Sequence, residues 1–221
     1  MMRRAVGSER SAWPMGPVLV GFMAASILVL AGCAEKGPAV VSSEYKPADD
    51  APGSTPYPRQ HSKQPAASLC RVRVAEVVDA RHDGAAMGYI GGRVIHAADA
   101  AAWTRSGLIS IGEDGHLALV DNPSPDGADV VVSAELLKAY MQTQTEAKAA
   151  TVVVRVHYVR RGGASETQTY RGSDTSLNWA NGDGETEHAL NRAMAQVLAA
   201  VRLDIYKQCE LVETGAGAGK P

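Results

Sequence analysis

The clearest pattern in the chain is an alternation of apolar and polar residues. Between Thr151 and Val159, one side of the predicted strand carries Val152, Val154, Val156 and Tyr158, and the other carries Arg155 and His157. A period of two is typical of a half-buried strand. Ser68–Asp79 alternates in the same way, and Thr167–Leu177 is another extended run after a turn at 160–164.

Residues 129–142 fit two patterns. A helix over Ser133–Met141 would have Ser133 as its N-cap and good helix formers behind it. Three valines, however, run directly into this segment, and a period of two continues through Val130, Val132, Ala134, Leu136 and Tyr140. We therefore predict a strand at 129–142, with the helix as the alternative. Together with the next two runs it forms an antiparallel meander.

An amphipathic helix is predicted over Glu185–Tyr206. Its apolar residues fall on one stripe at steps of three and four, namely Leu190, Met194, Val197, Leu198, Val201 and Ile205. Asp183 is a suitable N-cap. The apolar stripe should cover one face of the meander, which predicts an α+β fold of two layers: an antiparallel β-meander with a long C-terminal helix.

Shorter elements precede the meander. Met87–His96 is apolar but rich in glycine, so we expect one short strand or an extended loop there. Asp99 is a good N-cap for a short helix through Leu108. Turn residues on both sides of His116–Val120 frame another short strand.

The segment before the first strand is rich in proline. Residues 34–66 carry six prolines and no sustained apolar period, so they cannot bury enough surface to offset the entropy of ordering. We expect residues 33–67 to be a flexible tether, 68–212 a single domain and 213–221 a loose tail.

The N-terminal 32 residues are typical of an export signal. Arg3 and Arg4 are followed by the apolar run Val18–Leu30, which is shorter than the roughly 20 residues that a membrane span requires. Leu30-Ala31-Gly32-Cys33 resembles the lipobox of bacterial lipoproteins. That resemblance implies cleavage before Cys33 and acylation of this cysteine. The alternatives are a transmembrane helix and an ordinary signal peptide, which needs no cysteine after Ala-Gly.

Composition and charge restrict the partners. Removing residues 1–32 takes away three arginines and one glutamate, so the formal net charge of −2 becomes −4. A mildly acidic chain without a dense basic patch argues against nucleic acid as a partner. The single phenylalanine, Phe22, lies in the signal, so aliphatic residues with tryptophan and tyrosine must build the core.

Three cysteines are present, and Cys33 is assigned to lipid. Cys70 and Cys209 then form an even pair in an oxidising compartment, which favours a disulfide. Such a bridge would close almost the whole domain into one loop. The alternative is two buried free thiols.

Polar candidates for a binding surface are few. Asp79 and Arg81 follow an apolar strand and could bind a charged ligand or act as an acid/base pair, although a strand-end ion pair is the commoner arrangement. Tyr170, Arg171 and Trp179 could also contact a ligand, or pack structurally. The six histidines show no metal-ligand spacing, and no phosphate loop, dinucleotide fingerprint or nucleophile elbow is present, so we expect no metal, cofactor or catalytic residue.

The order of these elements resembles the YajG-type bacterial lipoproteins. The resemblance is diffuse over residues 68–206. It is sharpest at Thr169-Tyr170-Arg171-Gly172-Ser173 and in the helix from Glu187 onward. It implies a small α+β envelope protein, and it supplies no catalytic residue because the family has none assigned. Proteins of this general shape include auxiliary lipoproteins of envelope transport systems.

From the sequence we therefore expect a non-enzymatic binding or envelope-maintenance lipoprotein that is anchored to a membrane and faces the periplasm. Ala34, rather than aspartate, follows Cys33. By resemblance to enterobacterial sorting this favours the outer membrane, with the inner membrane as the alternative. An envelope protein is the expected partner, and the sequence does not define an oligomeric state. The alternatives are an auxiliary subunit of an envelope transport system and a periplasmic hydrolase with a cleft joining Asp79, Arg81 and a histidine.

Overall fold

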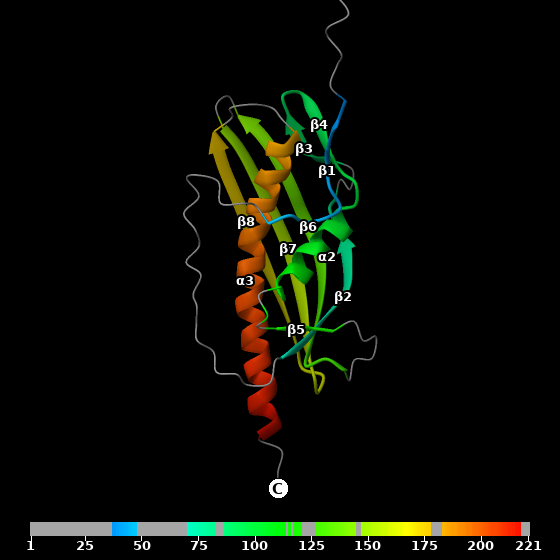
Figure 1. Cartoon of the computed structure of the whole chain (residues 1–221), viewed down its shortest axis with the longest axis vertical. Helices are drawn as coiled ribbons and strands as arrows, with labels where there is room; N and C mark the ends of the chain where they lie inside the picture. Colours follow the sequence, from blue (N-terminus) through cyan, green and yellow to red (C-terminus); the bar gives the residue numbers. More distant parts are fainter. Residues whose placement is uncertain are drawn as a thin grey trace, which may run out of the picture. The chain divides into compact units, whose positions relative to one another are not determined.

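An eight-stranded mixed sheet with helices on one face makes up the described part of the chain (Figure 1). The computed structural model describes residues 37–47, 70–82, 86–113, 115, 117–120, 127–144, 147–177 and 183–217. The described residues from Pro38 onward belong to one compact unit.

The meander is present as predicted. Strands β6 (Val130–Gln144), β7 (Ala147–Arg160) and β8 (Ser165–Leu177) pair antiparallel in chain order. The prediction of a strand rather than a helix at 129–142 is confirmed. Its period of two is interrupted at one place, where a bulge lies between Leu136 and Lys138 in the pairing with β7.

The sheet as a whole is mixed, so the prediction of a purely antiparallel meander is wrong for its other half. Strand β2 (Arg71–Asp79) runs parallel to the first half of β6, and β5 (Ala118–Leu119) runs parallel to β2. Between β2 and β6 the chain forms a hairpin and helix α2 (Ala100–Ser110), and a connection containing a helix is what parallel strands require.

The glycine-rich segment predicted as one strand or loop forms two strands. β3 (Ala86–Ile90) and β4 (Arg93–Ala97) make a hairpin with Gly91 and Gly92 at the turn, and both glycines have positive φ angles. β3 also pairs parallel with the end of β6. There a Cβ atom on Gly88 would overlap the backbone of Met141, so glycine permits this approach.

Part of the predicted tether belongs to the domain. Residues 39–41 form β1 (Ala39–Val41), which pairs parallel with β4. The side chains of Ala39, Val41 and Tyr45 are buried. The prolines on both sides concealed this short apolar run, and the expectation of a flexible tether is wrong for these residues. Residues 33–36 and 48–67 lie outside the described residues.

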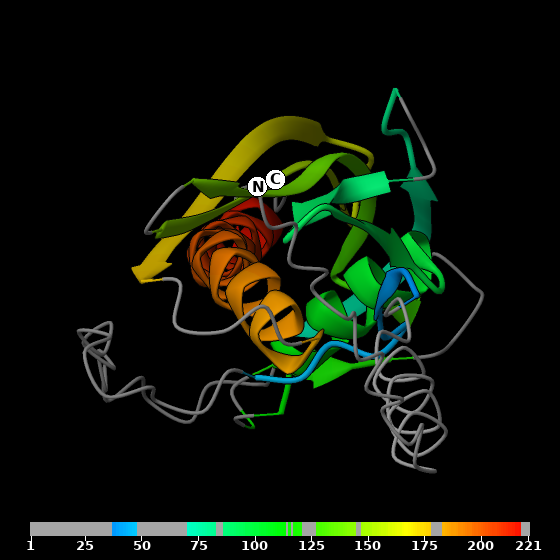
Figure 2. The same ribbon diagram turned by 90° about the horizontal axis from the view of Figure 1, so that it is seen from above.

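Helices α2 and α3 (Asp183–Gly217) lie on the concave side of the curved sheet (Figure 2). Asp99 caps α2 by accepting a hydrogen bond from the backbone N–H of Ala102. The predicted apolar stripe of α3 is buried against the sheet. The helix continues through Gly217, so residues 213–217 are helical rather than a loose tail. Within the described residues, no helix combines the length and the apolar character that crossing a membrane requires.

Candidate binding surface

The two faces of the meander have different neighbours. In β7 the even-numbered residues from 148 to 158 are buried beneath the helices, whereas Arg155 and His157 are exposed on the opposite side. We call this opposite side, with Ser133 and Glu135 of β6 and the odd-numbered residues of β8, the convex face. Figure 2 shows that α2 and α3 leave it uncovered. It is therefore a regular surface of the sheet on which a partner could bind.

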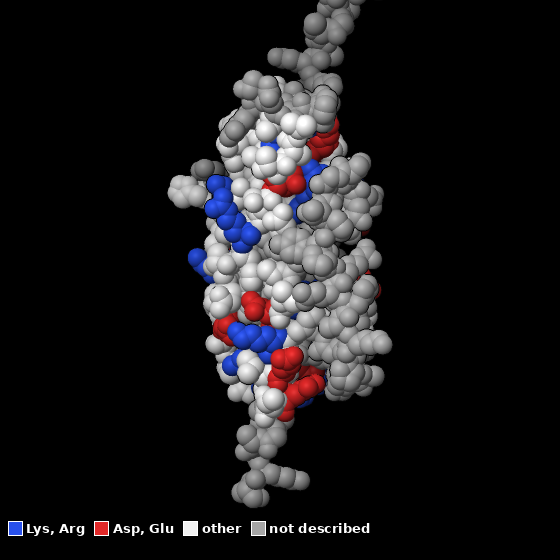
Figure 3. All heavy atoms as spheres, turned by 90° about the vertical axis from the view of Figure 1, so that its left-hand side faces the viewer, with Lys and Arg blue, Asp and Glu red and all other residues white. Residues whose placement is uncertain are grey.

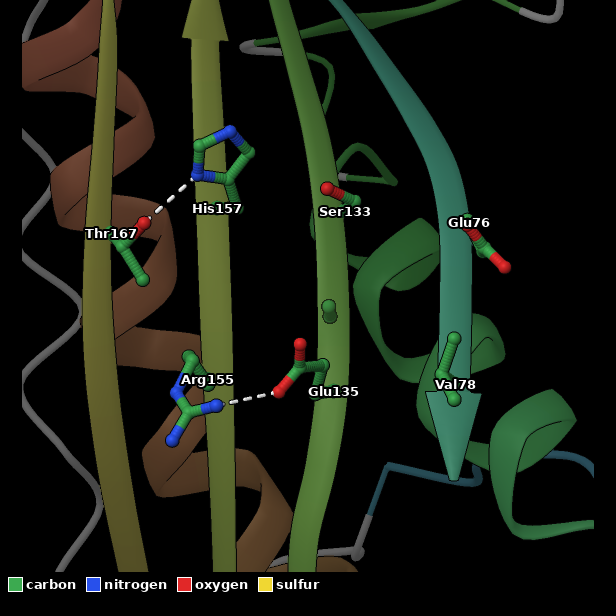
Figure 4. Close-up of a pocket in the computed structure, with 8 residues that line it drawn as sticks. Glu76, Val78, Ser133, Glu135, Arg155, His157 and Thr167 are labelled. Atoms are coloured by element: carbon green, nitrogen blue, oxygen red, sulfur yellow. Dashed lines mark hydrogen bonds and ion pairs between the residues drawn. The ribbon is translucent and has the colours of Figure 1, made fainter. Parts of the chain in front are cut away.

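A shallow depression of about 250 Å³ lies on the convex face, in the half where β6 and β8 begin (Figure 4). Four neighbouring strands contribute to its lining: β2 with Glu76 and Val78, β6 with Ser133, Ala134 and Glu135, β7 with Arg155 and His157, and β8 with Thr167.

Polar contacts link the side chains of this depression. Arg155 Nη1 donates a hydrogen bond to Glu135 Oε2 at 2.7 Å, and both side chains are about half exposed. His157 Nδ1 and Thr167 Oγ1 are 2.8 Å apart, and Ser133 lies opposite His157 in the strand pairing. The depression therefore presents hydrogen-bond donors and acceptors together with positively and negatively charged side chains. Because it is shallow, it suits an extended polar partner better than an enclosed small molecule.

A different polar group connects the concave face to α3. The hydroxyl of Tyr158 lies 2.7 Å from that of Tyr170, and Tyr170 donates to Asp204 Oδ2. Burial is the main cause that raises the pKa of both tyrosines, and the neighbouring Asp204 charge acts in the same direction. Both hydroxyls therefore stay protonated and able to donate at physiological pH.

Two ion pairs extend this connection toward the start of α3. Arg192 donates through Nε and Nη2 to both oxygens of Asp174, and Lys148, almost completely buried, pairs with Glu185. Burial, followed by the charge of Arg192, lowers the pKa of Lys148. Sequence reasoning missed these pairs. One signal in the sequence could have revealed them. Positions of Thr167–Leu177 that face the helix, including Tyr170 and Asp174, are polar, so the helix must supply polar partners for them.

Of the predicted surface residues that the structure describes, Asp79 and Arg81 form an ion pair, whereas Tyr170 and Arg171 lie on opposite faces of the sheet. Arg81 donates through Nε and Nη2 to both oxygens of Asp79 at the end of β2, and this hydrogen bonding lowers the pKa of the Asp79 carboxyl. Tyr170 lies on the concave side under α3, whereas Arg171 is exposed on the convex face. Trp179 and the lipid-attachment residue Cys33 lie outside the described residues.

Cys70 and Cys209 form a disulfide with 6.0 Å between their Cα atoms. The bond connects the residue before β2 with the last third of α3. The structure thus contains the predicted bridge rather than two free thiols.

In the described part of the chain, no three His, Cys, Asp or Glu side chains lie close enough together to hold a metal ion. On the side of the molecule seen in Figure 3, acidic and basic side chains lie next to one another rather than in a patch of one sign.

Comparisons with known proteins show the fold alone. No family model matches the sequence, and no curated protein matches it. The protein XCC0632 from Xanthomonas campestris, which carries the family model DUF330, is 9% identical, with 79% of this chain and 98% of that chain covered and a TM-score of 0.53. This similarity places the chain among α+β proteins of that architecture.

Two further solved structures are more distant. CT253 from Chlamydia trachomatis is 13% identical, covering 61% of this chain and 96% of that chain, with a TM-score of 0.41. A minor lipoprotein from Acinetobacter baumannii is 12% identical, covering 63% and 89%, with a TM-score of 0.33. At such scores neither structure carries an argument about the function of this chain.

Proposed function

We propose that this protein is a membrane-anchored lipoprotein that faces the periplasm and acts by binding rather than by catalysis. The observation that carries the proposal is the lipobox-like sequence Leu30-Ala31-Gly32-Cys33, placed after a short apolar signal and before a folded domain. Acyl chains on Cys33 would supply the anchor, because each buried CH₂ contributes about 0.8 kcal/mol of membrane affinity.

The convex face supports binding as the activity of the domain. Its central strands carry exposed polar side chains, and helices α2 and α3 of the described residues lie on the other face of the sheet. The depression around Glu135, Arg155 and His157 is open and holds both charge signs, which suits the surface of an envelope protein. Ala34 after the modified cysteine favours the periplasmic face of the outer membrane, with the inner membrane as the alternative.

The anchor is tested by mass spectrometry and cell fractionation. We expect the mature protein to begin at an acylated Cys33 and to sediment with membranes, and the Cys33→Ala protein to be soluble in the periplasm. An unmodified chain that retains Met1, or a Cys33→Ala protein that stays on the membrane, would contradict the proposal.

The binding activity is tested by photo-cross-linking in cells. A cross-linkable amino acid at Thr167, beside the depression, is compared with one at Leu203, an exposed position on α3. We expect a discrete cross-linked envelope protein from position 167 only. An inner-membrane transport complex as that partner would assign the auxiliary-subunit function. Equal, diffuse cross-linking at both positions would count against the convex face as the binding surface.

A further inference from the structure

The distance between the anchor and the domain is short. Strand β1 begins at Ala39, six residues after Cys33, and an extended chain of that length spans roughly 20 Å. β1 is firmly incorporated, because it pairs with β4, Ala98 N–H donates to Val41 O, and Tyr45 N–H donates to Ser106 Oγ. A lipid on Cys33 would therefore hold the β1 end of the domain close to the bilayer.

Several elements share that end of the molecule. β1 lies beside the β3–β4 hairpin at the upper end in Figure 1, where β6 and β8 also finish and α3 begins. The strand pairing confirms this, since Tyr89 of β3 pairs with Gln142 near the end of β6, and Gln144 pairs with Ala147, which in turn pairs with Leu177.

Exposed apolar side chains gather at this end. Val40, Tyr89 and Leu177 are 55%, 51% and 60% exposed. The strand register places all three on the convex side, but not on neighbouring strands. Val40 of β1 and Tyr89 of β3 lie on either side of β4, where Val40 opposes His96 and Tyr89 opposes Val94, and Leu177 lies on β8 at the other edge of the meander. Single exposed apolar residues are common on protein surfaces, and these three are distinguished by lying at the end nearest the anchor, where a membrane can cover them.

Two rows of paired residues on the convex side of this end carry no charge, whereas the charged Lys148 and Asp174 of neighbouring rows lie on the concave side, in ion pairs with Glu185 and Arg192 of α3. One row consists of Val94, Tyr89, Gln142, Ala149 and Thr175, and the next row within the meander consists of Tyr140, Thr151 and Ser173.

The first charges beyond these rows are both positive. Lys138 of β6 and Arg171 of β8 are exposed, and both pair with Val153 of the strand between them, β7. The acidic Glu135 of β6 lies farther from this end. A neutral convex band with two tyrosines, Tyr89 and Tyr140, followed by cations, matches the preferences of a bilayer surface with anionic headgroups.

We propose that the lipid bilayer surface is the partner of this end, with Val40, Tyr89 and Leu177 in contact with the headgroup region. The inference rests on the proposed function, because the acylated Cys33 brings the surface to the membrane. A short connection to the anchor gives this end of the domain a high effective concentration at the membrane surface. A small apolar contact is then sufficient to orient the domain. The charged depression then lies farther from the bilayer, where an envelope partner can reach it.

The test uses the full-length acylated protein in vesicles of phosphatidylethanolamine and phosphatidylglycerol. Cys33 is blocked by lipid and Cys70 is bonded to Cys209, so a single introduced cysteine can carry a fluorescent label. The variants are Tyr89→Cys and Leu177→Cys, and the matched control is Leu203→Cys on α3. Leu203 is 63% exposed, and Leu177 is 60% exposed. Lipids that carry a nitroxide near the headgroup quench a label that touches the membrane.

We expect quenching at positions 89 and 177 to be several-fold stronger than at position 203, and to fall when a long Gly/Ser segment is inserted between Gly37 and Pro38. Equal quenching at all three positions in protein that floats with the vesicles would overturn this inference and leave the anchor intact. Protein that lacks the lipid and does not float would contradict the proposed function as well. Quenching that is unchanged by the insertion would contradict the role of the short connection.

Discussion

The side chains on the concave and convex faces of β6–β8 differ in what they contact, although they belong to the same strands. On the concave side Val152, Val154 and Val156 are buried beneath α3, and the polar residues among them are paired with the helix. On the convex side Arg155 and His157 are exposed, and each is hydrogen-bonded to a side chain of a neighbouring strand. Because side chains alternate along a strand, one residue step separates positions that stabilise the fold from positions available to a partner.

This separation predicts that substitutions will fall into two classes. Changes on the concave side should lower the free energy of unfolding, whereas changes on the convex side should leave it almost unchanged and affect binding.

The disulfide should have the largest effect, because it holds α3 to the edge of the concave face. Cys70→Ser with Cys209→Ser removes a link between residues 139 positions apart. The free energy of unfolding should fall by about 4 kcal/mol, since the unfolded chain gains the entropy of a long open loop. Urea denaturation of the oxidised, reduced and doubly substituted proteins measures this. Reduced wild type should match the variant, and a midpoint equal to that of the oxidised protein would contradict the prediction.

Gly172→Ala comes next, because Gly172 is where β8 approaches the α3 backbone. An added Cβ would overlap the carbonyl oxygen of Ala193, so helix and strand must separate. We expect a loss of about 3 kcal/mol. The control is Thr175→Ala on the convex side of the same strand, which should lose little. Thermal unfolding followed by circular dichroism compares the two, and equal melting temperatures would show that α3 moves aside without cost.

Tyr170→Phe breaks the hydroxyl chain beneath α3. The change leaves Asp204 and the Tyr158 hydroxyl without their shared partner, which should lower the free energy of unfolding by about 2 kcal/mol. Tyr89→Phe, at an exposed position, is the control and should be neutral. If both variants unfold at the same denaturant concentration, water replaces the lost hydroxyl fully.

Much of the fold could be predicted from local patterns. Period-two alternation identified β7, and it identified β6 against a competing helical pattern, because residues alternately face a core and solvent; β8 was predicted as an extended run after a turn. The apolar stripe of α3 and the N-cap at Asp99 could also be predicted, because each depends on residues that are close together in the sequence. The pairing of Cys70 with Cys209 followed from their number and the expected compartment.

What could not be predicted depends on contacts between distant segments. The parallel pairing of β2 with β6 requires knowing where the chain goes after α2, and no residue of either strand encodes it locally. β1 is three residues long among prolines, and its burial depends on β4 being beside it. The convex depression likewise brings together Glu76 and Thr167 from strands far apart in the sequence.

The smallest expected effect comes from a comparison of two ion pairs on opposite faces, one with two hydrogen bonds and one with a single hydrogen bond. Arg192 and Asp174, on the concave side, are 19% and 14% exposed, whereas Arg155 and Glu135, on the convex side, are 47% and 46% exposed. Asp174→Asn should lower the free energy of unfolding by about 1.5 kcal/mol, because a largely buried guanidinium loses its charged acceptor.

Glu135→Gln should change it by less than about 0.5 kcal/mol, because water solvates Arg155 in its place. Double-mutant cycles with Arg192→Gln and Arg155→Gln measure each coupling directly. A high salt concentration should weaken the convex coupling more than the concave one, because water and ions reach it more easily. If the convex pair were coupled as strongly as the concave pair, Glu135 and Arg155 would be part of the fold's stability, and the division between the two faces would fail at the centre of the proposed binding surface.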